Sequence, residues 1–346
     1  FNTLQPKWPN RDRFILSAGH GSMLLYSLAY LCGYADFDID QLKNFRQLGM
    51  KTAGHPENFL SDVIETTTGP LGQGLANSVG FAIAEESLRA KFGRKIIDHY
   101  TYVIAGDGCL MEGVSQEAIS LAGHLSLNKL IVFWDNNNIT IDGPVDLTDS
   151  TNQKMRFEAS GWNVIEIDGH DPTEIDMAIK AAKNSQKPTM IACETHIAIG
   201  TAAQDTSKGH GALTDPELIK NAREVYKWSH KPFEIPKSVK EQWEEAGLEG
   251  DKTFKEWKSN LGNLSVSKKS EFERVFNGDT PKKMSTVIRK FKKENSAALP
   301  TIATRKASEL TLNTINSIMG ETIGGSADLT GSNTVSYTHL RAHETL

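Results

Sequence analysis

Three short and nearly continuous apolar runs mark the first part of the chain. They read YTYVIA at 100–105, LIVFW at 130–134 and TMIAC at 189–193. Strands of a parallel sheet have this pattern because helices cover both of their faces. Residues 162–167 are a weaker fourth candidate of the same kind.

Longer stretches with helical spacing of apolar residues lie between these runs. We expect helices over 73–92, 112–125 and 172–185. The last has a clear beginning, because Asp171 can cap it, Pro172 suits its first position and Glu174 stands where a capping-box acid belongs. The alternation predicts an α/β fold, with a mostly parallel sheet and helices on both faces.

The composition of the chain changes after residue 235. Residues 236–297 are rich in Lys and Glu with scattered Trp, Phe and Leu, which is typical of a charged helical connecting region. Residues 298–334 then show a helical run followed by GETIGGSADLTGSN, read as a strand and a Gly-rich turn. We therefore divide the chain into a first domain (1–235), the connecting region, the start of an incomplete second α/β domain (298–334) and an anomalous tail (335–346).

Composition and charge narrow the classes of function. The chain has 346 residues, and 38 Lys and Arg against 43 Asp and Glu give a net charge of −5, which argues against a nucleic-acid partner. No run approaches the roughly 20 apolar residues that cross a bilayer, so we expect no membrane partner. The widely spaced Cys32, Cys109 and Cys193 favour a reducing compartment such as the cytosol. We therefore expect a cytoplasmic protein. Because the sequence begins at Phe1 and not at Met, a transit peptide to an organelle stays an alternative.

Two polar loops follow two of the predicted strands. The string GDG at 106–108 follows the first apolar run, and NN at 136–137 follows the second. Ligands bind beyond the carboxyl ends of parallel strands, so the two loops can converge. The carboxylate of Asp107 and the amide oxygen of Asn137 are hard ligands that suit Mg²⁺, whose remaining positions phosphate oxygens and water fill. The alternative is that each loop is an ordinary turn, since Gly-Asp-Gly and Asn-Asn are both common in turns. The G-x-G-x-x-G motif of a dinucleotide site is absent there.

A second glycine-rich string, GPLGQG at 69–74, leads directly into the helix expected from residue 73. Such a turn exposes backbone N–H and C=O groups beside a helix N-terminus, where they can hold a flat heterocycle or an anion. The alternative is an ordinary loop before a helix.

Three histidines lie among glycines or in turn-like strings, namely His20 in SAGHGSM, His55 in TAGHPE and His210 in KGHGALTD. A neutral imidazole there can donate to or accept from phosphate oxygens and sugar hydroxyls. A purely structural role is the alternative for each. Zinc is disfavoured because no H-E-x-x-H or paired C-x-x-C accompanies them. We expect no role for His124 or His170, and assign the DGHD string at 168–171 to the helix cap.

Several longer strings together resemble one family. They are RDRFILSAGHGSM, LKNFRQLGMKTAGHPE, ETTTGPLGQGLANSVGFAIAE, GDGCLMEGVSQEAISLAGHLSLNKLIVFWDNNNITIDG, MRFEASGWNVIEIDGHD and GGSADLT. They cover most of residues 8–333, in the order found in transketolases, and the spacing from GDG to NN is similar to the thiamine diphosphate fingerprint. The resemblance implies reversible transfer of a two-carbon ketol unit from a ketose phosphate to an aldose phosphate, as in the pentose phosphate pathway.

The resemblance also implies the cofactors and the assembly. We expect thiamine diphosphate, with Mg²⁺ or another divalent cation such as Ca²⁺ or Mn²⁺, and a homodimer in the full-length protein. The first domain would bind the cofactor's diphosphate, and residues 298–334 would begin the domain that binds its pyrimidine.

Individual roles follow by matching positions to the family. Metal ligands would be Asp107, Asn137 and the carbonyl of Ile139. Contacts to the cofactor would come from His20, Gly69, Leu71, Gly108, Asn137, His210 and, near the dimer interface, Asp328. The residues expected in catalysis are His55, which would meet the donor's hydroxyls, and His210. The sugar phosphate would be bound by Arg305 and Ser332.

The sequence also departs from the family. The loop GTAAQDTSK at 200–208 differs from the commoner form, VSYTHLRAHETL at 335–346 matches nothing expected there, and the glutamate that activates the cofactor is not found. We therefore expect an N-terminal fragment of a transketolase that is inactive in isolation. The alternatives are a transketolase of the dihydroxyacetone synthase type and a non-catalytic cofactor-binding or dimerising module.

Overall fold

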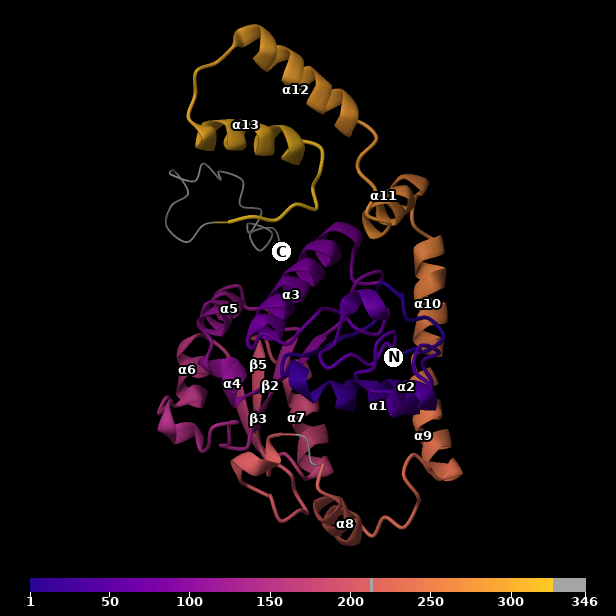
Figure 1. The fold of residues 1–346 in the computed structure, drawn as a ribbon. Coiled ribbons are helices and arrows are strands. Elements are labelled where there is room, and N and C mark those ends of the chain that lie inside the picture. The colour runs from indigo at the N-terminus through magenta and orange to yellow at the C-terminus, as the bar shows by residue number, and fades with distance from the viewer. Residues whose placement is uncertain (212–213, 326–346) are drawn as a thin grey trace. The chain divides into compact units, whose positions relative to one another are not determined.

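The computed structural model describes residues 1–211 and 214–325 of the chain (Figure 1). The backbone forms two compact units. The first contains residues 1–85 and 98–256, and the second contains residues 86–97 and, within the described part of the chain, 257–325. Helix α3 (Gln73–Phe92), which was expected over this range, belongs to the first unit in its N-terminal part and to the second at its end.

A five-stranded parallel sheet is the framework of the first unit. Its strands are β1 (Arg13–Leu16), β2 (Thr101–Gly106), β3 (Leu130–Asn136), β4 (Asn163–Asp168) and β5 (Thr189–Glu194), in the order β1-β2-β3-β5-β4. The apolar runs are strands β2, β3 and β5, as predicted, and the weaker candidate is β4. Strand β1 was not predicted, because it has only four residues at the edge of the sheet.

Helices cover both faces of this sheet. Helices α1 (Ser22–Cys32) and α7 (Pro172–Asn184) lie on one side of the strands, and α5 (Gly113–His124) and α6 (Gln153–Ala159) lie on the other (Figure 1). Under α7, the side chains of Ile131 and Ile191 are fully buried against Ala182. Burying each isoleucine contributes roughly 2 kcal/mol to stability. The predicted α/β architecture with helices on both faces is thus confirmed.

The turn after β2 differs from the prediction in detail. A short helix, α4 (Asp107–Met111), begins directly after Gly106, and the helix expected over 112–125 is observed as α5. The strand therefore passes straight into a helix, which places the Asp107 side chain at the carboxyl end of the sheet.

The beginning of α7 agrees with the prediction in one respect and not in another. The carboxylate of Asp171 accepts hydrogen bonds from the backbone N–H groups of Thr173 (2.7 Å) and Glu174 (3.4 Å), as a capping residue does. The carboxylate of Glu174 accepts from the backbone N–H of Asp168 (2.8 Å) rather than from that of Asp171. The N–H of Asp171 is already bound to the carbonyl of Asp168, so a reciprocal capping box does not form.

Further helices complete the first unit. They are α2 (Ile39–Lys43), α8 (Pro216–Val225), α9 (Lys237–Leu248) and the beginning of α10 (Asp251–Gly262). Helix α9 packs on α1 so closely that a Cβ at Gly247 would lie 2.2 Å from the carbonyl oxygen of Cys32. Only a glycine allows the two helices to meet at this point.

The second unit is helical in its described part. It contains the end of α10, then α11 (Val266–Phe276), α12 (Met284–Ala298) and α13 (Thr304–Asn316). Phe272 is buried, with its ring 5.2 Å from that of Phe92 in an edge-on arrangement. The strand predicted after the last helix is not found in residues 317–325, and the rest of that prediction lies outside the described residues.

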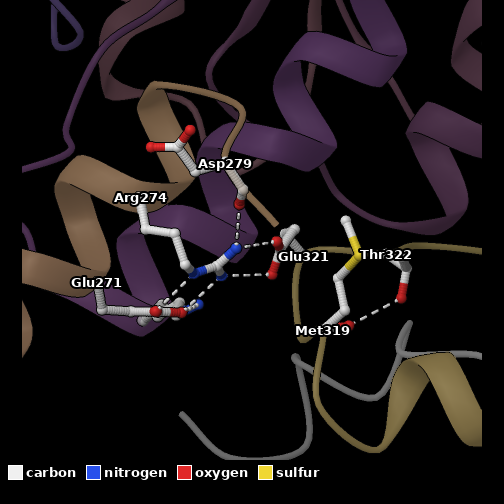
Figure 2. Close-up of polar contacts among 7 residues, drawn as sticks. Glu271, Arg274, Asp279, Met319, Glu321 and Thr322 are labelled. Carbon is white, nitrogen blue, oxygen red and sulfur yellow. Dashed lines mark hydrogen bonds and ion pairs between the residues drawn. The ribbon is translucent and has the colours of Figure 1, made fainter. Parts of the chain in front are cut away.

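Arg274 on α11 is largely shielded from water, with 13% of its side chain exposed. The guanidinium of Arg274 on α11 forms ion pairs with Glu271 (2.8 Å) and Glu321 (2.7 Å), and also donates to the carbonyl oxygen of Asp279 (2.8 Å) (Figure 2). Glu271 in turn pairs with Lys91 at 2.7 Å. The pKa of Glu271 is lowered to about 2, chiefly by the hydrogen bonds from Arg274 and then from Lys91. The cluster holds the turn after α13 against α11.

Candidate functional site

A cavity of about 480 Å³ opens at the carboxyl ends of strands β2 and β3. It brings together residues that were predicted from separate parts of the sequence: His20, Leu71, Asp107, Gly108, Asn137, Ile139 and His210. The convergence of the GDG and NN loops follows from strand register, because Gly106 pairs with Asp135 across the sheet.

Asp107 is one of the two acidic residues that line this cavity, and it is the more deeply buried one. Its Oδ1 accepts a 2.9 Å hydrogen bond from the indole N–H of Trp134 on β3. Its Oδ2 is buried and has no hydrogen-bond partner among the described residues. Burial raises the pKa of Asp107 to about 6, and the charge of Asp135 adds to the rise. The hydrogen bond from Trp134 opposes it, as do, more weakly, the nearby backbone N–H groups of Asn138 and Asn137. A buried carboxylate oxygen without a partner is costly unless a cation or a donor meets it.

The loop after β3 has two more oxygen atoms that could hold a cation, in the side chain of Asn137 and the backbone carbonyl of Ile139. The Oδ1 of Asn137 accepts a hydrogen bond from the backbone N–H of Ile139 (3.0 Å), and its amide group donates to Asp135 (3.2 Å). These bonds fix the amide so that its oxygen keeps one lone pair for a further partner. Residues 1–211 and 214–325 contain no cluster of three or more His, Cys, Asp or Glu side chains placed to hold a metal. The available set is instead one carboxylate, one amide and one backbone carbonyl, and such hard oxygens suit Mg²⁺ or Ca²⁺.

Two histidines stack on each other in the cavity wall. His20 lies in the helical turn η1 (Gly19–Gly21), and His210 follows the turn η4 (Ser207–Gly209). Their ring centroids are 5.1 Å apart and the rings are inclined by 29°. The pKa of His20 is lowered by burial first, and then by the neighbouring His210 and His55. The Nδ1 atom of His210 is buried and has no partner in the described part of the chain, so this ring nitrogen can still donate to or accept from a polar ligand.

The loop with Gly69 lies beside these histidines. Gly69 has φ of 149°, and a Cβ there would be 3.1 Å from the Cγ atom of the His55 ring. The backbone of His55 is fixed in turn, since its carbonyl accepts from the hydroxyl of Tyr26 (3.3 Å). Leu71 reaches the cavity wall, whereas His55 and Gly69 are not among the lining residues.

The remaining predicted residues are Arg305, Asp328 and Ser332. Arg305 is near the beginning of α13, in the second unit. Asp328 and Ser332 lie outside the described residues.

The structure adds residues that sequence reasoning missed. Asp135, His170, Thr195 and His196 all line the cavity. The Nε2 atom of His170 accepts a hydrogen bond from the backbone N–H of His196 (3.0 Å), and the two rings stack at 5.8 Å. His170 was expected to have no role beyond its place in the cap string. No local signal identifies this contact, because it joins residues 26 positions apart in sequence.

In the described part of the chain, no helix combines the length and the apolar character that crossing a membrane requires.

The family model described as "Transketolase, thiamine diphosphate binding domain" matches residues 1–281. A transketolase of Rhodobacter capsulatus is 53% identical over 334 residues, which are 96% of this chain and 50% of that protein. The crystal structure of a transketolase from Campylobacter jejuni superimposes with a TM-score of 0.86 at 41% identity, over 98% of this chain and 52% of that one. A Pichia stipitis transketolase variant in complex with fructose 6-phosphate gives a TM-score of 0.89 at 40% identity, over 98% and 51% of the two chains.

The chain thus spans about half the length of the curated relatives it matches. The family model extends from the first residue through the sheet and into the helices that follow it. By this match, and by the agreement in sequence and fold, the chain belongs to the transketolase family and contains its thiamine diphosphate-binding domain.

Proposed function

We propose that this chain supplies the diphosphate-holding part of a transketolase active site. The whole protein would reversibly transfer a two-carbon ketol unit from a ketose phosphate to an aldose phosphate in the pentose phosphate pathway. The observation that carries the proposal is the buried Oδ2 atom of Asp107, which has no partner among the described residues in the wall of the cavity. A site complementary to a bound cation and its anionic ligand explains why this unpaired acceptor persists.

The oxygen atoms around Asp107 fit a divalent cation. Asp107, the Oδ1 atom of Asn137 and the carbonyl of Ile139 would hold Mg²⁺, with the remaining positions left to phosphate oxygens and water. Ca²⁺ and Mn²⁺ prefer the same hard oxygen donors. A cation there would favour the ionised carboxylate and offset the burial that raises the pKa of Asp107.

The histidine pair fits the anionic end of the cofactor. His20, His210 and the backbone at Gly108 would contact the diphosphate, which would give the buried Nδ1 atom of His210 a partner. When bound, thiamine diphosphate supplies the electron sink for cleaving and forming the carbon–carbon bond. The chain's own residues would hold the phosphates and the cation that neutralises their charge, and would fix the orientation of the cofactor.

The substrate contacts rest on the family positions. Gly69 and Leu71 would support the aminopyrimidine, and His55 would meet the hydroxyls of the donor sugar, with His210 close to the substrate as well. The sugar phosphate would be bound by Arg305 and Ser332. A guanidinium suits this task because it binds phosphate through two parallel hydrogen bonds.

The proposal extends to the organisation of the protein. Residues 1–235 would form the diphosphate-binding domain, 236–297 a connecting region and 298–334 the start of the pyrimidine-binding domain. The whole protein would be a cytoplasmic homodimer, with Asp328 near the cofactor at the dimer interface.

The test is an activity assay of the whole protein with thiamine diphosphate and Mg²⁺. We expect ketol transfer from xylulose 5-phosphate to ribose 5-phosphate that stops when either the cofactor or the cation is withdrawn. Faster transfer to formaldehyde would favour the dihydroxyacetone synthase type of activity. Turnover that needs neither thiamine diphosphate nor a divalent cation would contradict the proposal.

A further inference from the structure

The loop of residues 196–210 closes on itself through one pair of side chains. The Nδ1 atom of His196 lies 3.0 Å from both carboxylate oxygens of Asp205. The backbone N–H of Asp205 donates to the carbonyl oxygen of Ile197 (3.1 Å). A carboxylate accepts only, so the imidazole donates from Nδ1 whether or not its other nitrogen is protonated. The pair therefore joins the first residue of the loop to one near its middle.

The closed loop contains backbone conformations that other contacts must hold. Ala198 and Asp205 have φ of 51° and 56°, in the left-handed region that costs a non-glycine residue roughly 1 kcal/mol. The hydroxyl of Thr201 donates to the carbonyl of Ala198 (2.8 Å), and the side chain of Gln204 accepts from the backbone N–H of Gly200 (3.0 Å). These bonds cross the interior of the loop and make it one compact turn.

This turn carries His210 at its far end. Ala203 is only 4% exposed inside the loop. Gly209 packs there so tightly that a Cβ on it would be 2.7 Å from the Cβ of Ala198 and 2.8 Å from the carbonyl oxygen of Ala203. His210 is the next residue, and its backbone N–H donates to the carbonyl of Ser207 (3.1 Å). The position of the His210 ring thus depends on the loop staying closed.

The other end of the loop is anchored to the sheet. The backbone N–H of His196 donates to His170, which precedes α7. Thr195, one residue earlier, donates through its hydroxyl to Asp135 at the end of β3. The backbone of His196 is therefore fixed, and the hydrogen bond from its side chain restrains Asp205 in turn.

We propose that His196 and Asp205 form a latch that holds the 196–210 loop closed and so positions His210 against His20 for a diphosphate ligand. Both are positioning residues, since they act through the loop. The choice of ligand rests on the proposed function, whereas the closure of the loop does not. Asp205, one of the two latch residues, lies in the stretch 200–208, where the sequence departs from the commoner family form.

The two sides of the latch are half exposed, with side-chain exposures of 56% and 46%. Exposed pairs of this kind contribute little to global stability. Removing the His196–Asp205 pair should therefore leave the unfolding midpoint of the chain unchanged. It should make the 196–210 loop less ordered, which hydrogen exchange measures. This separates the proposal from a general structural role.

The experiment compares the chain with His196→Ala, Asp205→Ala and the swapped double variant His196→Asp/Asp205→His. The exposed His124 on α5 supplies the matched control, His124→Ala. Hydrogen exchange of the backbone amides in 197–210 is measured without cofactor, and thiamine diphosphate binding is measured by calorimetry in Mg²⁺. We expect each single variant to speed exchange in the loop and to weaken binding about five-fold. The double variant should recover at least part of both effects, and His124→Ala should change neither.

Two results separate the latch from the proposed function. If the unchanged chain binds no thiamine diphosphate but His196→Ala still speeds exchange in the loop, the latch stands and the ligand assignment fails. If the unchanged chain binds the cofactor, and both single variants bind it equally well with unaltered loop exchange, the latch is overturned. Equal losses in the single variants with no recovery in the swapped variant would also overturn it, since the pairing would then be irrelevant.

Discussion

The indole N–H of Trp134 on β3 donates a 2.9 Å hydrogen bond to Oδ1 of Asp107, the residue that directly follows the neighbouring strand β2. Trp134 is 7% exposed and Asp107 is 8% exposed, so the bond is shielded from water. It fixes the carboxylate with one oxygen satisfied and the other, Oδ2, without a partner among the described residues. The geometry orients an acceptor for a ligand that the protein itself does not provide.

Replacing Trp134 by Phe tests this orientation. The variant removes the hydrogen bond to Asp107 and keeps an aromatic ring in the core. We expect a loss of about 2 kcal/mol in the free energy of unfolding, together with a higher Mg²⁺ concentration for half-maximal thiamine diphosphate binding.

Trp162 offers a matched control for this variant. Its indole N–H donates to the backbone carbonyl of Ile119 (2.8 Å), and it too is buried, at 3% exposure. Trp162→Phe should lower stability in urea unfolding by a similar amount and leave the Mg²⁺ dependence unchanged. Equal shifts of the Mg²⁺ midpoint in both variants would show that Trp134 has no specific effect on the carboxylate.

The first turn of α3 depends on a glycine that touches the sheet. A Cβ at Gly74 would lie 2.5 Å from the Cα of Ser17, which is backbone and cannot rotate away. The hydroxyl of Ser17 also accepts from the backbone N–H of Leu75 (3.0 Å), so the contact is fixed on both sides. Gly74→Ala should therefore destabilise the chain by about 3 kcal/mol or more, as measured by urea unfolding.

Gly80, in the same helix, offers the matched control. It is exposed, and a Cβ added there would meet no atom of the described residues within 4 Å beyond its own helix backbone and chain neighbours. Gly80→Ala should be neutral or stabilise by up to roughly 1 kcal/mol, because alanine favours the helix. Similar destabilisation in the two variants would mean that the contact with Ser17 does not decide the outcome.

Stability should fall on mild acidification because of His99. Its pKa is lowered from 6.5 to about 4, chiefly by burial and then by the charges of Lys129 and Arg11. The unfolded chain binds a proton on this imidazole near its ordinary pKa, and the folded chain does so only near pH 4. The free energy of unfolding contributed by the neutral form is thus complete above pH 6.5 and is lost as the pH falls toward 4, by about 3 kcal/mol in total.

The measurement is urea unfolding between pH 7 and pH 4 for the chain and for His99→Gln. Subtracting one curve from the other removes the contribution of the other titrating groups. We expect the free energy of unfolding of the unchanged chain, minus that of His99→Gln, to decrease as the pH falls. A difference that stays constant across this range would show that His99 titrates alike in the folded and unfolded chains.

The Arg274 cluster should control the order of the turn after α13. Arg274→Lys keeps the charge but loses the planar group that meets Glu271 and Glu321 together (Figure 2). We expect faster hydrogen exchange at residues 317–322 and a loss of about 1 kcal/mol, since the carboxylates are partly exposed. The control is Arg289→Lys at an exposed position of α12. Unchanged exchange in both variants would mean that the ion pairs do not hold the turn.

The framework of the site could be predicted from the pattern of the chain. Nearly continuous apolar runs identify β2 and β3 because both faces of these strands are buried. Once the strands are parallel, the rule that their carboxyl ends share one edge brings Asp107 and Asn137 to the same cavity.

The rest depends on contacts that no local pattern encodes. Strand β1 has too few residues for a periodicity, and its pairing with β2 joins positions about 88 residues apart. The stacking of His20 on His210 and the bond between His170 and His196 are likewise made by the tertiary fold. The glycine-rich strings around His20 and His210 made them candidates, and the resemblance to a family assigned their roles. Nothing in the sequence indicated the latch partner Asp205.

The role of Asp107 is the central claim, and calorimetry of thiamine diphosphate binding to the chain and to Asp107→Asn, each with and without Mg²⁺, tests it most directly. We predict that Mg²⁺ strengthens binding to the unchanged chain and that Asp107→Asn loses at least about ten-fold in affinity together with the response to Mg²⁺. Binding by Asp107→Asn with the affinity and the Mg²⁺ dependence of the unchanged chain would contradict the account.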